Sequence, residues 1–240
     1  MELYDEFGGA ELDDALWQVS PLPLPGGGHH LPRDPHTRVV VRDGEAEIGI
    51  PRFSLSDDRF QTADSVKFLA LSTRVFDLPA AGAATFAADF AVTTAGGDPG
   101  DYRTGIACLQ VADLAETHRV FSVGGTSARA FAMHEHLAPD PSGDPFVHVA
   151  ESPYADFDDD LTRLRAAEVT LDPATHLVTW RLDGRTIYHA YEPGLPRRVR
   201  LGLGIFTMLP IRDGRSRSLR GQGISARFRR PRVLGVPKPH

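Results

Sequence analysis

The sequence predicts an all-β fold, an antiparallel β-sandwich that is either open or closed into a barrel, with little helix. Short runs in which apolar and polar residues alternate recur along the chain, and this period of two is typical of strands. Most of the 23 glycines and 19 prolines stand between these runs, where turns are needed. The chain also lacks a long apolar repeat of helical period.

The strands can be assigned in order along the chain. They cover residues 38–41, 46–50, 66–72, 85–93, 106–111, 118–123, 130–136, 168–171, 177–182, 186–190, 198–206 and 223–229. Asp43-Gly44 and Asp183-Gly184 each join two strands and are strong hairpin signals. The stretch 167–190 therefore predicts a three-stranded meander. One or two helical turns are expected at 158–167, and long loops at 20–36 and 212–223.

The bulk composition predicts a single domain over residues 1–240, with an N-terminal arm at 1–37 and a basic C-terminal tail at 230–240. A chain of 240 residues with 41% hydrophobic content is long enough to bury one substantial core. The acidic start resembles no secretory signal, and no apolar run is long enough to span a membrane. With Cys108 as the only cysteine, these features favour the cytoplasm.

Positive charge is concentrated near the C-terminus. Twelve of the 26 Lys and Arg residues lie between residues 197 and 240, where Asp213 is the only acid. Such a segment either binds an anionic partner or pairs with acids on neighbouring strands. Because it lacks interleaved aromatic residues, we expect no nucleic-acid partner.

The strand 130–136 carries the most suggestive side chains. Alternation places His134 and His136 on one face and Phe131, Met133 and Glu135 on the other. If the second face is apolar, burial raises the pKa of Glu135 and makes it a general acid or base. If the strand leaves the core there, Glu135 is solvated.

The two histidines are also a candidate metal pair, with Asp140 following as a carboxylate. A third histidine at a suitable place is missing, so no metal is predicted. The chain also lacks a phosphate-binding loop, a dinucleotide fingerprint and a nucleophile elbow, so no cofactor is predicted.

Two further clusters precede strands. Asp101, Tyr102 and Arg103 precede strand 106–111, and Asp64, Ser65 and Lys67 lie at the start of strand 66–72. Each cluster either lines a pocket at a strand end or forms a turn with a surface ion pair.

The meander sequence VTWRLDGRTIY at 178–188 resembles the concanavalin-like jelly rolls, which include laminarinase-like glycosidases and laminin-G-like modules. The opening Tyr4-Asp5-Glu6-Phe7, with the later Trp17, and the glycine-rich 201–206 resemble other parts of that fold. The resemblance covers about a quarter of the chain and implies a jelly-roll sandwich in which Asp5, Phe7 and Trp17 tie the N-terminus to the sheets.

The catalytic motif of those glycosidases is absent. Laminarinase-like enzymes carry E-x-D-x-x-E on one strand, so that alternate carboxylates face the cleft. Here Glu45 and Glu47 lack the third acid, and Glu11-Leu12-Asp13 is followed by Leu16 where the last glutamate would stand. Hydrolysis by that pair of carboxylates is therefore not expected.

Three functions remain open. The first is a cofactor-free cyclase or isomerase that binds a hydrophobic, polyketide-like small molecule in a cavity. The missing cofactor motifs favour it, as does a composition typical of high-GC bacteria, in which such cyclases serve natural product biosynthesis. The second is a carbohydrate-binding module or divergent glycoside-active protein, with an open groove and exposed aromatics such as Trp17, Tyr154 or Tyr191. The third is a protein-interaction domain without chemistry. An oligomer is left open.

The first hypothesis assigns residues to a site. The predicted catalytic residues are Glu135, Asp101, Arg103, Tyr102 and His134. The predicted substrate-binding residues are Trp180, Met133, Phe131, Asp64 and Lys67.

Overall fold

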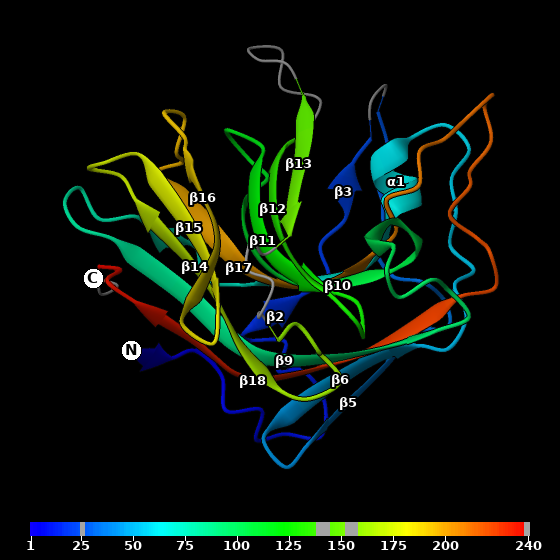
Figure 1. Cartoon of the computed structure of the whole chain (residues 1–240), viewed down its shortest axis with the longest axis horizontal. Coiled ribbons are helices and arrows are strands. Elements are labelled where there is room, and N and C mark those ends of the chain that lie inside the picture. Colours follow the sequence, from blue (N-terminus) through cyan, green and yellow to red (C-terminus); the bar gives the residue numbers. More distant parts are fainter. Residues whose placement is uncertain (25–26, 138–144, 152–157, 238–240) are drawn as a thin grey trace.

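Two eight-stranded antiparallel sheets packed face to face form the molecule (Figure 1). The computed structural model describes residues 1–24, 27–137, 145–151 and 158–237. The predicted all-β antiparallel jelly-roll sandwich is confirmed, and the described strands form two open sheets rather than a closed barrel. In that part of the chain, no helix is long and apolar enough to cross a membrane.

One sheet, called here the convex sheet, runs along the bottom of Figure 1 and rises at the left. Its strand order is β16 (Arg185–Tyr191), β15 (Leu177–Leu182), β14 (Arg165–Asp172), β9 (Ala84–Ala95), β18 (Gly223–Leu234), β6 (Glu45–Ile50) and β5 (Arg38–Arg42), with β1 (Glu2–Leu3) beside β18. The predicted meander corresponds to β14–β16 and is confirmed.

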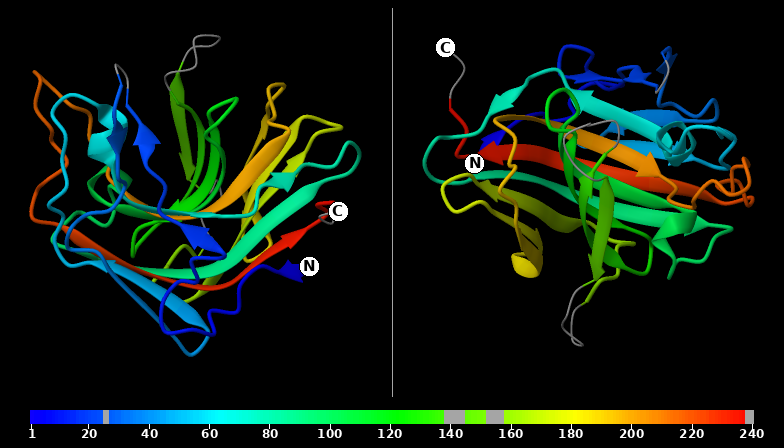
Figure 2. Two further views of the ribbon diagram at one scale, coloured as in Figure 1. Left: turned by 180° about the vertical axis from the view of Figure 1, so that it is seen from behind. Right: turned by 90° about the horizontal axis from the view of Figure 1, so that it is seen from above.

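The other sheet is called here the concave sheet, because it bends up toward β12 and β13 on one side while α1 and β3 stand on the other (Figures 1 and 2). Its order is β13 (Phe146–Glu151), β12 (Ala130–His136), β11 (Arg119–Gly125), β10 (Ile106–Asp113), β17 (Arg198–Phe206), β7 (Val66–Ser72) and β2 (Trp17–Gln18), and β8 (Phe76–Asp77) pairs with β17. The remaining elements are the pair β3 (Leu22–Pro23) and β4 (His29–His30), the helix α1 (Gln61–Ser65) and a 3₁₀ turn at Tyr102–Thr104.

The two Asp-Gly pairs form the hairpin turns that the sequence predicts. Asp43 and Gly44 have φ values of 53° and 75°, and Asp183 and Gly184 have values of 48° and 76°. Two successive residues in the left-handed region are the signature of a type I′ turn, whose twist matches that of the flanking strands. These turns fix the β5–β6 and β15–β16 pairings.

The main core lies between the two sheets and includes Trp180, Phe121 and Phe90. The N-terminal segment is tied to it as the jelly-roll resemblance implies. The Trp17 indole N–H donates to Asp5 Oδ2 at 2.7 Å, and the Phe7 backbone N–H donates to Asp5 Oδ1 at 2.7 Å. Tyr4 packs edge-on against the Trp17 ring.

Some local predictions were wrong. Residues 158–167 form no helix: the chain is irregular up to residue 164, and β14 begins at Arg165, since its alternating burial favours a strand. Conversely, the sequence did not indicate α1 or β13. Asp140, the candidate carboxylate for the histidine pair, lies outside the described residues.

The C-terminal arginines pair with acids on neighbouring strands. Arg230 and Arg232 both bind the carboxylate of Asp89 on β9, and Arg227 lies 3.4 Å from Glu45. Three of the twelve basic residues near the C-terminus are therefore paired with acids within the convex sheet.

Candidate functional site

The floor of the candidate site is the outward, concave face of the concave sheet. Gln110 on β10 lies opposite Ser122 on β11, which lies opposite Met133 on β12. One step along, Val120 lies opposite Glu135. Since alternate residues of a strand share a face, these side chains form rows across three strands.

Two glycines leave room for side chains on this floor. A Cβ atom on Gly204 would lie 2.3 Å from the ring of Phe206, and one on Gly124 would lie 2.8 Å from Cys108 Sγ. A larger residue at either position would push a floor side chain aside. The glycine-rich β17 thus lets the Phe206 ring lie flat against the sheet.

A wall stands on the side of the floor near β7. It is built from β3, the helix α1 and the segment that follows β17. Gln61 on α1 ties the wall together, because its amide donates to the Leu209 carbonyl at 3.1 Å and accepts from the Ile211 N–H at 2.9 Å.

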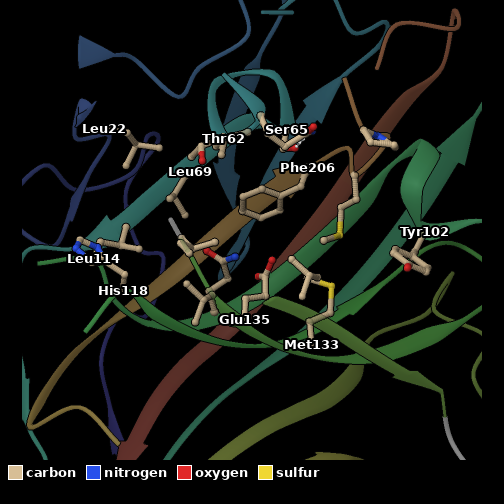
Figure 3. A pocket seen from close by; sticks show the side chains of 18 of the residues that line it. Leu22, Thr62, Ser65, Leu69, Tyr102, Leu114, His118, Met133, Glu135 and Phe206 are labelled. Carbon is tan, nitrogen blue, oxygen red and sulfur yellow. Dashed lines mark hydrogen bonds between the residues drawn. The ribbon is translucent and has the colours of Figure 1, made fainter. Parts of the chain in front are cut away.

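Floor and wall enclose a pocket of about 400 Å³, within the range of roughly 300–1,000 Å³ that is usual for small-ligand sites. Figure 3 shows Phe206 and Leu69 on the side of the pocket opposite Glu135 and Met133. Seven lining residues can form hydrogen bonds through their side chains: Gln61, Thr62, Ser65, Tyr102, Gln110, His118 and Glu135. The other lining side chains are apolar.

Glu135 is the chemically distinctive residue of the pocket. It is 8% exposed, and its carboxyl has no hydrogen-bonding or ion-pair partner among the described residues. Removal from water disfavours the charged carboxylate, so burial raises the pKa of Glu135 from 4.5 to about 7. Near neutral pH this group can both donate and accept a hydrogen bond or a proton.

Three of the residues that the sequence predicted for the site line this pocket: Glu135, Tyr102 and Met133. Phe131 lies next to them, buried beneath Tyr102 with the two ring centres 5.1 Å apart. Tyr102 is placed over the floor by the 3₁₀ turn, which Asp101 caps by accepting a hydrogen bond from the Arg103 N–H.

Asp101 and Arg103 themselves do not line the pocket. Their side chains form a two-pronged ion pair, with Nε–Oδ1 and Nη2–Oδ2 distances of 2.8 and 2.9 Å. The hydrogen bonds from Arg103 outweigh burial and lower the pKa of Asp101. This is the turn-and-ion-pair arrangement that the sequence left open, and it serves to position Tyr102.

His134 lies on the opposite face of β12 and points into the space between the sheets, with its ring 5.9 Å from that of Trp180. Its Nε2 lies 2.9 Å from Glu192 Oε2. Burial alone would raise the pKa of Glu192, but the hydrogen bonds from His134 and the Gly194 N–H hold that pKa below its ordinary value. Trp180 is fully buried in the main core, so neither residue reaches the pocket.

Asp64 and Lys67 are buried behind the wall. Lys67 Nζ donates to the Leu55 carbonyl at 2.6 Å and to Ser218 Oγ at 3.0 Å, and it lies 3.9 Å from Asp64 Oδ1. Ser216 and Ser218 both donate to the same carboxylate oxygen. Burial lowers the pKa of Lys67 to about 8, partly offset by Asp64. This cluster attaches the loop after β17 to the wall.

No group of three potential metal ligands is found within residues 1–24, 27–137, 145–151 and 158–237. Of the aromatic residues expected to form an exposed platform, Trp17 is buried and Tyr191 is exposed at the far edge of the convex sheet. Tyr154 lies outside the described residues.

The pocket residues that sequence reasoning missed include Gln110, Gln61, His118 and Phe206. Only Gln110 had a usable signal, since it is a polar residue in an otherwise apolar strand. Gln61 and Phe206 come from elements far apart in the chain, and no local pattern brings them together.

A family model described as a family of unknown function, DUF6081, matches residues 4–237. A search of the curated proteins finds no match.

Solved structures share the fold at low identity. The catalytic domain of an endo-1,3-β-glucanase (laminarinase) from Thermotoga petrophila is 12% identical with a TM-score of 0.59, and the match covers 94% of each chain. The endo-1,3-β-glucanase from Streptomyces sioyaensis is 12% identical with a TM-score of 0.58, covering 97% of this chain and 95% of the other. The endo-β-1,3-glucanase from Pyrococcus furiosus is also 12% identical with a TM-score of 0.58, covering 98% and 94%.

These neighbours confirm the concanavalin-like jelly roll, and they overturn the first functional hypothesis. A cyclase or isomerase for a polyketide-like, hydrophobic small molecule is wrong, because the structures that the chain resembles are glucanases. The error came from an analogy of genomic setting that no residue motif supported. The carbohydrate alternative fits the neighbours better.

Proposed function

Because the chain belongs to the DUF6081 family, whose function is unknown, we propose a function from the pocket itself. The protein binds a saccharide in the concave pocket, with Glu135 as the central hydrogen-bonding group. The observation that carries the proposal is a buried carboxyl that has no partner among the described residues and that lines a pocket on the concave face of a glucanase-like jelly roll.

The lining suits a sugar ring. Hydroxyl groups of a saccharide need donors and acceptors, and Gln110 and Glu135 supply both from two strands of the floor. The C–H face of a pyranose packs on aromatic rings, and Tyr102 and Phe206 offer such rings at the pocket surface.

Hydrolysis by a pair of carboxylates is not part of the proposal. Retaining glycosidases place two carboxyl groups about 5–5.5 Å apart, and inverting enzymes place them about 6.5–9.5 Å apart. Among the described lining residues, Glu135 is the only carboxylic acid. The pocket therefore supports binding of a saccharide better than two-carboxylate cleavage.

A second candidate is a glycoside-active enzyme with Glu135 as its only general acid. The pKa of about 7 favours it, since a carboxyl that is half protonated at neutral pH can donate a proton to a leaving group. Turnover of an aryl glycoside that disappears in Glu135→Gln would support this candidate over simple binding.

The remaining assignments are parts of the same proposal. The partner is a small saccharide rather than a nucleic acid, since Arg227, Arg230 and Arg232 are already paired with acids of the protein. The proposed location is the cytoplasm, which suits the single buried thiol of Cys108.

Calorimetric titration with laminari-oligosaccharides and mixed-linkage β-glucan oligosaccharides tests the proposal. Glu135→Leu removes the central hydrogen bonds and keeps the side-chain size, so we expect binding about 10–100-fold weaker. Misfolding would not explain that loss, because replacing a buried acid by leucine in an apolar surround favours folding. Glu168→Gln on β14, outside the pocket, serves as the control and should bind as the wild type does. The proposal fails if no saccharide binds, or if Glu135→Leu binds as tightly as the wild type.

A further inference from the structure

A second apolar cluster covers the concave face of the concave sheet, separate from the main core. It includes Leu69, Leu71, Phe131, Met133 and Phe206. The outward face of a sandwich sheet ordinarily carries polar residues, because only the inward face packs against the other sheet. Here β7, β10 and β12 are buried on both faces.

Apolar residues line the pocket on both its wall side and its floor side. Leu22, Val66, Leu69, Phe206 and Met208 come from β3, β7, β17 and the segment after β17, and together they form what we call the apolar wall. Figure 3 shows Leu22, Leu69 and Phe206 on this side, with Glu135 on the other. Polar residues of α1, such as Thr62 and Ser65, lie on the wall side as well, and Met133 lies beside Glu135. The pocket is therefore lined mainly by apolar side chains, with a few polar groups among them.

A mainly apolar lining is poorly suited to an unsubstituted oligosaccharide. Its hydroxyl groups point outward around each ring, so a sugar that filled the whole pocket would bury hydroxyls against Val66, Leu69 and Met208. Those hydroxyls would lose hydrogen bonds to water and gain none from the protein. A ligand with a sugar at one end and an apolar group at the other satisfies both the polar groups of the floor and the apolar wall.

We propose that the natural ligand is a glycoside bearing an apolar substituent, such as an alkyl, acyl or aryl group, whose sugar contacts Glu135 and Gln110 while the substituent packs on the apolar wall. The inference rests on the proposed saccharide binding and names the ligand class for the same site.

The wall is a built feature rather than an incidental apolar patch. Gln61 fixes α1 to residues 209 and 211, and the buried Lys67 cluster attaches the following loop to the same wall. Val66, Leu69 and Phe206 are each less than 9% exposed, so the apolar surface lines an enclosed pocket instead of facing open solvent.

A series of alkyl β-glucosides tests the inference, with methyl, butyl, hexyl and octyl members titrated calorimetrically below their micelle concentrations. Burial of each added CH₂ should tighten binding about fourfold until the wall is filled. Met208→Gln is nearly isosteric and places an amide on the wall, so it should flatten this gain and weaken octyl β-glucoside binding more than methyl β-glucoside binding. Leu177→Gln, at an exposed apolar position on β15, is the matched control and should keep the gain.

Different results would overturn the inferred ligand class and the proposed saccharide binding. If laminari-oligosaccharides bind at Glu135 but chain length has no effect on glucoside affinity, the inference is overturned and saccharide binding stands. If octan-1-ol binds as tightly as octyl β-glucoside, or if neither sugars nor glucosides bind, the proposed function itself is overturned.

Discussion

Replacing Glu135 by glutamine should abolish a pH dependence of stability that is built into the wild-type pocket. Burial raises the pKa of Glu135 from 4.5 to about 7. Between these two values the unfolded chain releases the proton while the folded chain keeps it, so the contribution of Glu135 to stability falls as the pH rises from about 4.5 to about 7 and is constant above. A shift of that size corresponds to about 3 kcal/mol at about 1.4 kcal/mol per pKa unit.

The assay is urea denaturation of the wild type and Glu135→Gln at a series of pH values from 4.5 to 8.5. Glutamine is neutral at every pH, so the two proteins should differ little at pH 4.5. At pH 8.5 the variant should exceed the wild type by about 3 kcal/mol. Glu168→Gln, on the convex sheet, controls for global charge. A difference between wild type and variant that does not change with pH would refute the reasoning, because it would mean that Glu135 titrates alike in both states.

Two further substitutions test other parts of the structure. Gly204→Ala would place a methyl group 2.3 Å from the Phe206 ring; we expect a loss of about 1–3 kcal/mol in unfolding free energy and weaker ligand binding, and unchanged melting would contradict the close approach. Lys67→Met removes the buried amine that donates to Leu55 and Ser218, and it leaves the buried Asp64 carboxylate without a counter-charge. Chemical denaturation should show a loss of about 3–5 kcal/mol in unfolding free energy, and a variant as stable as the wild type would show that the cluster is dispensable.

The fold was predictable because its signals are local. The Asp183-Gly184 turn lies between two strands whose alternation is clear, and both residues adopt the left-handed conformation that the turn type requires. Asp5 and Trp17 form the expected N-terminal attachment. By contrast, β13 was missed, since as an exposed edge strand it has no buried face to leave a pattern.

The site was less predictable. Alternation correctly separated Glu135 from His134, but both faces of β12 are buried, so the pattern did not say which face meets the other sheet. For that reason His134 and Trp180 were predicted for the site, although they lie in the space between the sheets. The apolar wall depends on contacts between β3, β7 and β17, which are far apart in the chain, and no local pattern reports them.

The most direct test of the central claim is a crystal structure of the protein with a bound β-linked oligosaccharide or alkyl β-glucoside. The account predicts sugar density in the concave pocket, with a hydroxyl within hydrogen-bonding distance of the Glu135 carboxyl. Density elsewhere on the molecule with the pocket left empty would contradict it.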